Sequence, residues 1–177
     1  MGAGILPVCK INNKIYFLFG KERNIDDNPG WSDFGGGSEP NESFIETATR
    51  ECSEEISGFL GSKKEIKNML NKNGYLNIFL PNQTSKSNGY KVFITPIKYD
   101  PYLPIYFNNH QEFIHKNLDA KIIKSSKLFE KTEIKWFSFD DIKKNKKKFR
   151  NFYQRIIHIL LENKDLISKD IQKLISK

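Results

Sequence analysis

The feature that most constrains this sequence is a run of three glycines followed closely by a short amphipathic helix. Gly35–Gly37 indicate a backbone under tight constraint, and we predict a loop there. Ser43 followed by Glu46 is typical of a capping box, and the pair Ser57-Gly58 supplies a stop signal. These signals predict a helix of about 13 residues directly after the glycines.

Three glutamates of this predicted helix stand at positions i, i+3 and i+4, so they share one face. They are Glu51, Glu54 and Glu55. Like charges at this spacing repel, which makes sense if divalent cations offset the repulsion, and oxygen ligands suit Mg²⁺ or Mn²⁺ better than zinc. Taken alone, the triad also fits an ordinary solvated acidic face.

The residues around the triad decide between these interpretations. Counted from Gly36, Glu42 comes six residues on, Arg50-Glu51 follow, Cys52 is apolar, and Glu54-Glu55 close the series. This spacing resembles the Nudix box, G-x5-E-x7-R-E-U-x-E-E-x-G-U, where U is aliphatic or similar. The preceding WSDFGG resembles the family's strand and loop. Ser57 and Gly58 depart from the last glycine and apolar positions, which puts the helix exit in question more than metal binding.

The resemblance implies an α/β fold, an α/β/α sandwich with a mixed sheet and the box helix on one side. It implies that magnesium or manganese is the cofactor and that a bound water attacks phosphorus, with Glu54 or Glu55 assisting. The implied metal ligands are Glu51, Glu54, Glu55 and the carbonyl of Gly35, and the implied supporting ion pair is Glu42 with Arg50.

Family members often use one further acid from a later loop. Glu112, Glu130 and Glu133 are candidates, and the sequence does not choose among them.

Local patterns outside the box supply the other elements of the sandwich. Asn12-Asn13 separates two apolar, β-favouring runs and predicts a hairpin. Further strands are expected at 75–80, 90–97 and 133–139, a polar loop at 24–32, a loop at 99–107, and helices at 108–118, 146–161 and 164–175. Cys9 and Cys52 lie in apolar runs without a partner motif, so we expect buried thiols.

The net charge of +8 is concentrated in the last third of the chain, where residues 121–177 hold 16 basic and 7 acidic side chains. The basic run includes Lys144, Lys146, Lys147 and Lys148, and it offers a surface for RNA phosphates. Phe149 and Phe152 interleave with it, but their helical spacing with later apolar residues favours the core. We expect a hydrolase domain over 1–142 and a basic helical extension over 143–177 packed on the same domain.

The resemblance implies a magnesium-dependent hydrolase that cleaves a phosphoanhydride bond in a nucleoside diphosphate linked to another moiety. Two alternatives stay open: an enzyme that removes caps from messenger RNA, and an inactive binding module with the same fold. A simple basic RNA-binding protein would leave the glutamates unexplained. The expected partner is a nucleotide-like small molecule, or capped RNA, and not a membrane, and the expected location is the cytosol or nucleus. The sequence leaves the oligomeric state open.

Overall fold

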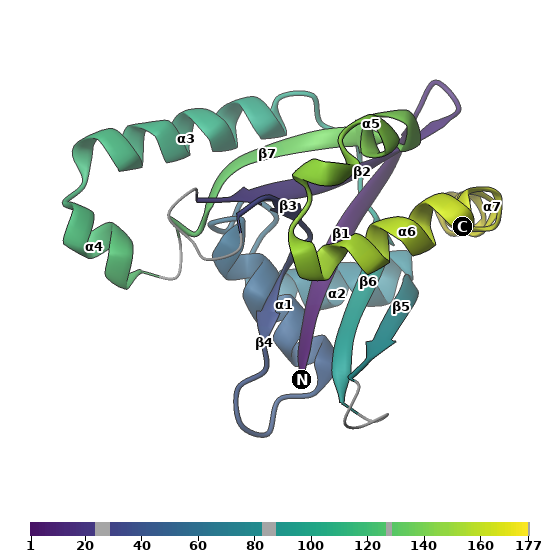
Figure 1. Cartoon of the computed structure of the whole chain (residues 1–177), viewed down its shortest axis with the longest axis horizontal. Coiled ribbons are helices and arrows are strands. Elements are labelled where there is room, and N and C mark those ends of the chain that lie inside the picture. The colour runs from purple at the N-terminus through teal and green to yellow at the C-terminus, as the bar shows by residue number, and fades with distance from the viewer. Residues whose placement is uncertain (24–28, 83–87, 127–128, 177) are drawn as a thin grey trace.

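The computed structural model describes residues 1–23, 29–82, 88–126 and 129–176 (Figure 1). Within these ranges seven strands form one mixed sheet of order β3-β2-β1-β6-β5, in which β4 also pairs with β1 and β7 with β2. The strands are β1 (Gly2–Ile11), β2 (Lys14–Glu22), β3 (Trp31–Ser32), β4 (Phe34–Gly37), β5 (Leu76–Pro81), β6 (Gly89–Pro96) and β7 (Lys131–Ser138).

The predicted N-terminal hairpin is confirmed. β1 and β2 pair antiparallel up to Ile11 and Lys14, and both turn residues are left-handed, with φ of 47° at Asn12 and 62° at Asn13. Two successive positive φ angles give the hairpin turn that matches the twist of its strands. β1 also pairs in parallel with β6, so it is the central strand of the sheet.

Helices cover both faces of the sheet, which confirms the α/β/α sandwich (Figure 1). The helices are α1 (Phe44–Glu55), α2 (Lys63–Asn73), α3 (Leu103–Asn117), α4 (Ala120–Ser125), α5 (Phe139–Lys144), α6 (Gln154–Glu162) and α7 (Lys164–Ile175). One core cluster joins α1, α2 and α3 to residues such as Ile5 and Leu18, and the other joins α5, α6 and α7 to residues such as Leu6 and Phe17. Alternate residues of β1 therefore face opposite helical layers.

The predicted loop at the three glycines is wrong. Gly35–Gly37 belong to β4, which pairs antiparallel with β1 from Gly2 opposite Gly37 to Ile5 opposite Phe34. The two backbones lie so close that a Cβ on Gly35 would stand 2.3 Å from the Cα of Gly4. Glycine weakens an isolated strand, but here it permits the close contact between the backbones of β1 and β4. This contact joins segments far apart in the sequence, so local patterns do not predict it.

Other differences concern helix boundaries. The loop predicted at 99–107 ends early, because α3 begins at Leu103 and takes Pro104 in its first turn, where proline costs no hydrogen bond. The helix predicted from Lys146 begins only at Gln154, after two 3-10 turns. Helices α2, α4 and α5 were not predicted. Of the predicted loop at 24–32, residues 24–28 lie outside the described residues, and Trp31–Ser32 form β3.

Burial confirms most of the expected core. Cys9 and Cys52 are buried free thiols, and Phe149 is packed in the core. Phe152, expected beside it, keeps 38% of its surface exposed, because the chain around it forms a 3-10 turn instead of an α-helix. No helix in the described ranges is long and apolar enough to cross a membrane.

Candidate active site

The apolar stripe of helix α1 packs on the sheet, and this packing sets where the glutamates lie. Ser43 and Glu46 form the predicted capping box, with the Ser43 hydroxyl accepting from the Glu46 amide. Ala48, Cys52 and Ile56 are completely buried against the sheet, and this packing fixes the rotation of the helix. The carboxylates that flank this apolar stripe are thereby held beside β4.

The exit from α1 accommodates both departures from the box pattern. Ser57 and Gly58 have φ angles of 51° and 73°, so two successive residues are left-handed. A left-handed backbone is costly for serine, and the Ser57 hydroxyl accepts a hydrogen bond of 3.1 Å from Nε2 of Gln111, which helps to hold it there. Asn41, before the helix, is also left-handed with φ of 66°.

Arg50 ties the helix to the residues that precede it. Its Nε and Nη2 donate to the two carboxylate oxygens of Glu42, both at 2.9 Å, and Nη2 also donates to the carbonyl of Gly37 at 2.9 Å. This two-point contact lowers the pKa of Glu42 to about 2. Glu42 and Arg50 thus form the ion pair that the resemblance implies.

Glu51 and Glu54 meet at the same guanidinium. Nη1 of Arg50 lies 2.7 Å from Oε1 of Glu51 and 3.3 Å from Oε2 of Glu54. A Cβ on Gly36 would stand 2.7 Å from the carboxyl of Glu51. Glycine at this position therefore leaves room for the Glu51 carboxylate. The two carboxylates therefore converge on one positively charged point beside β4.

Glu55 has a different environment, although it belongs to the same face. The Gly35 amide donates to its Oε2 at 2.7 Å, and Nζ of Lys131 lies 3.3 Å from its Oε1. Only 3% of Glu55 is exposed, and burial raises its pKa well above the usual value, against the opposing charge of Lys131. Glu55 is held inside the protein, whereas Glu54 keeps 28% of its side chain exposed.

Lys131 belongs to a buried charged network that the sequence did not predict. Its ammonium pairs with Glu22 and hydrogen-bonds the Ser32 hydroxyl at 2.9 Å, and Nη1 of Arg150 reaches the same Glu22 oxygen at 2.6 Å. The pairing of β2 with β7 shifts register after Lys21, which brings Glu22 opposite Lys131. Bulges of this kind redirect side chains. Because glutamate and lysine are rarely buried, nothing in the sequence indicated that Glu22 and Lys131 would lie inside the protein.

Asp33 lies next to this network and is completely buried. It accepts a hydrogen bond of 2.9 Å from the Tyr90 hydroxyl through Oδ1, and burial raises its pKa to about 7. The contact fixes the Tyr90 ring over Gly4 and Gly35, where a Cβ on either glycine would come within 2.6 Å of the hydroxyl.

The three later acids are separated by the fold. Glu112 is exposed on α3 and pairs with Lys116, and Glu133 pairs with Lys21 at 3.3 Å on β7. Glu130 is half-buried just before β7, and burial together with the charges of Glu22 and Glu51 raises its pKa. Of the three candidates, Glu130 is therefore the one whose charge interacts with the box helix.

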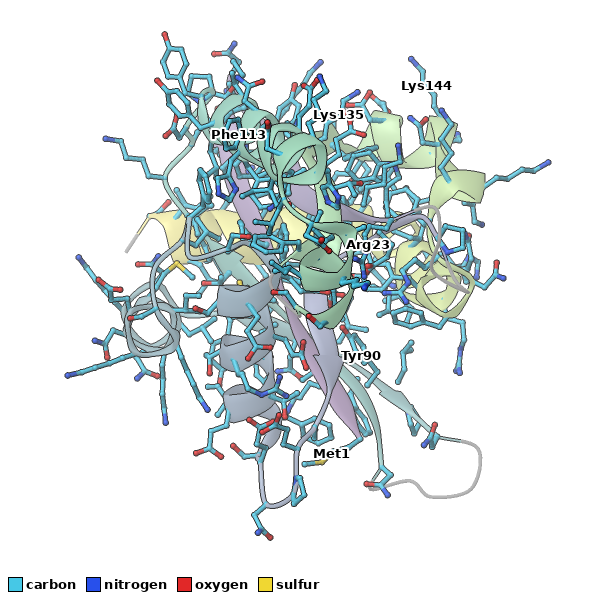
Figure 2. The ribbon with its side chains drawn as sticks, turned by 90° about the vertical axis from the view of Figure 1, so that its left-hand side faces the viewer. Met1, Arg23, Tyr90, Phe113, Lys135 and Lys144 are labelled. Carbon is cyan, nitrogen blue, oxygen red and sulfur yellow. The ribbon has the colours of Figure 1, made fainter. Side chains whose placement is uncertain are left out.

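The basic run lies apart from the carboxylates. Lys144 ends α5, and Lys146–Lys148 form the following 3-10 turn with all their side chains exposed. Figure 2 places Lys144 at the opposite end of the molecule from Met1. The Met1 carbonyl accepts a hydrogen bond from the amide of Ser38, just after β4, so Lys144 lies away from the glutamate site.

No three His, Cys, Asp or Glu side chains within the described ranges converge closely enough to hold a metal ion in their present positions. The donor set nevertheless fits a divalent cation, because Glu51 and Glu54 offer oxygen atoms to one positive charge, that of Arg50.

Comparisons with known proteins identify the family. A family model of the NUDIX domain matches residues 1–158. Solved structures with a similar fold include a bifunctional NMN adenylyltransferase/ADP-ribose pyrophosphatase from Francisella tularensis, complexed with AMP and a manganese ion. It is 19% identical, the match covers 91% of this chain and 41% of that chain, and the TM-score is 0.52.

A diadenosine tetraphosphate (Ap4A) hydrolase from C. elegans is 18% identical, with 81% of this chain and 84% of that chain covered and a TM-score of 0.46. No curated protein sequence matches significantly. Because the family model spans most of the chain and the box carboxylates are present, the chain belongs to the NUDIX family of hydrolases.

Proposed function

We propose that this protein hydrolyses a phosphoanhydride bond in a nucleoside diphosphate linked to another moiety, with Mg²⁺ or Mn²⁺ as cofactor. The observation that carries the proposal is the convergence of Glu51 and Glu54 on one guanidinium nitrogen beside Gly36. The same two carboxylates would supply oxygen ligands to a divalent metal ion.

Glu51 and Glu54 are the first candidates to hold the ion, because Glu55 is buried beneath them with contacts to both of its oxygens. Glu55 and the carbonyl of Gly35 complete the proposed ligand set. When bound, the ion supplies charge neutralisation for the diphosphate and acidifies a coordinated water. The chain's own contribution is Arg50, which holds the two outer carboxylates together and anchors them to Glu42.

Glu130 is our choice for the additional acid from a later segment. It is half-buried and lies within electrostatic reach of Glu51, whereas Glu112 and Glu133 have lysine partners elsewhere. Its role is to accept a proton from the attacking water.

The experiment is a panel of ADP-ribose, Ap4A, a nucleoside triphosphate and capped RNA, incubated with Mg²⁺ or with EDTA. The first two probes follow from the substrates named for the F. tularensis and C. elegans proteins. We expect a mononucleotide product from a nucleoside diphosphate derivative, released in Mg²⁺ and not in EDTA.

Each alternative predicts a different outcome of this panel. Turnover of capped RNA alone would favour decapping, for which the exposed lysines of the basic run are the supporting observation. Binding without turnover of any compound would favour an inactive binding module.

A further inference from the structure

A cavity of about 550 Å³ lies over the N-terminal end of β1 and the C-terminal end of the antiparallel strand β4. Gly2 and Gly35–Gly37 line one side of it, and Tyr90, Arg150, Phe152 and Arg155 line another. Its volume is in the range of small-molecule sites. A Cβ on Gly36 would meet the carboxyl of Glu51, whereas a Cβ on Gly35 would meet the Tyr90 hydroxyl, so the box glutamates and the cavity lie on opposite faces of the short strand β4.

The charge of this cavity suits an anion. Arg150 and Arg155 are the charged residues among its described lining, which includes no carboxylate. Arg150 is held in place by Glu22, by a hydrogen bond from its amide to the Trp31 carbonyl at 3.0 Å, and by the core packing of the preceding Phe149. Arg155, at the start of α6, is exposed. The two guanidinium groups can therefore face phosphate oxygens.

An aromatic surface adjoins these charges. Phe152 is 38% exposed, and the Arg150 guanidinium carbon lies 5.0 Å from the centre of its ring. Tyr90 contacts the same ring edge-on, with centroids 5.5 Å apart, and is itself fixed by Asp33. A large apolar ring held rigid and left partly open to a basic cavity favours stacking of a planar heterocycle.

We propose that this cavity binds the nucleoside end of the substrate, with the base against Phe152 and the adjoining phosphate at Arg150 and Arg155. This inference rests on the proposed function, because the diphosphate would then pass the edge of β4 at Gly36 and Gly37 to reach Glu51 and Glu54 on the other face. In this arrangement Arg150, Phe152 and Arg155 of the C-terminal region recognise the nucleotide, and helix α1 supplies the hydrolytic residues.

The test measures metal-free binding of AMP and of ribose 5-phosphate by calorimetry, so it needs no turnover. Phe152→Ala is compared with Phe113→Ala, an exposed aromatic on α3 that Figure 2 places at the opposite end of the molecule from Met1, a residue of the cavity lining. Arg155→Gln is compared with Lys169→Gln, an exposed cation on α7. Melting temperatures of all four variants establish that each is folded.

We expect Phe152→Ala to weaken AMP binding at least about tenfold and to leave ribose 5-phosphate unchanged, since the variant loses the stacking surface alone. Arg155→Gln should weaken both ligands, and the two control variants neither. Equal AMP affinity in Phe152→Ala and the parent would overturn the inference. If that happens while the parent still hydrolyses a nucleoside diphosphate derivative, the proposed function survives. If AMP binds as predicted but no compound is hydrolysed, the proposed function fails and the nucleotide site stands.

Discussion

The buried ammonium of Lys131 lies 3.3 Å from Oε1 of Glu55, so the last glutamate of the box is matched by a cation from the protein itself. Glu54, its neighbour in sequence, instead pairs with Arg50 near solvent. The box helix therefore combines an outer pair of carboxylates held by Arg50 with an inner carboxylate that joins helix α1 to strand β7.

Replacing Lys131 by Met should destabilise the protein severely. The variant leaves Glu22 and Glu55 buried without the ammonium between them, and breaking a buried pair in this way costs about 3–5 kcal/mol. Urea unfolding measures the destabilisation, with Lys135→Met, an exposed lysine of the same strand, as the control. The double variant Glu22→Gln/Lys131→Met should recover part of it. A Lys131→Met protein as stable as the parent would contradict this account of the network.

Arg50→Ala should reduce both stability and activity. Arg50 and Glu42 each keep only about 12% of their side chains exposed, so the cost should approach the roughly 3–5 kcal/mol of a buried pair. Lys63→Ala is the matched control, because Lys63 contacts the same carboxylate at 3.8 Å but is 48% exposed and should cost at most about 1 kcal/mol. Similar melting temperatures for the two variants would show that the Arg50 pair behaves as a surface pair.

Acid should weaken the same ion pair. The pKa of Glu42 is about 2 in the folded protein, below its ordinary 4.5, so its contribution to stability is complete above pH 4.5 and disappears as the pH falls toward 2. The difference corresponds to a free energy on the order of 3 kcal/mol. Urea titrations at pH 6, 4.5 and 3 should show a steeper decline for the parent than for Glu42→Gln, and parallel declines would refute the assignment.

The sequence predicted the parts of this structure that local chemistry determines. The Asn12-Asn13 hairpin and the Ser43 capping box depend on neighbouring residues, and the structure confirms both. The strand at Gly35–Gly37 and the buried Lys131 depend on distant partners, namely β1 and Glu22. Local patterns associate glycine with loops and lysine with solvent, so neither could be foreseen.

The alternative of an RNA substrate has its own test in the basic run. Neutralising Lys144, Lys146, Lys147 and Lys148 together should weaken binding of capped RNA. It should also flatten the salt dependence of binding, by nearly one unit of log-log slope for each lysine that neutralises a phosphate in the parent. A matched variant neutralises Lys63, Lys64, Lys67 and Lys72, exposed lysines of α2. If both variants bind RNA like the parent, the basic run is only a solvated surface.

The central claim is that the outer box carboxylates, Glu51 and Glu54, support metal-dependent hydrolysis. The most direct test measures the initial rate of the Glu54→Gln variant as a function of Mg²⁺ concentration, with the best substrate of the panel. Glu54 is 28% exposed, so the amide should leave the melting temperature unchanged, while a poorer metal ligand should lower turnover at least about 100-fold. Glu133→Gln, which removes a partly exposed carboxylate from β7, should keep the parent rate. A folded Glu54→Gln protein with the parent's rate and magnesium dependence would contradict the account.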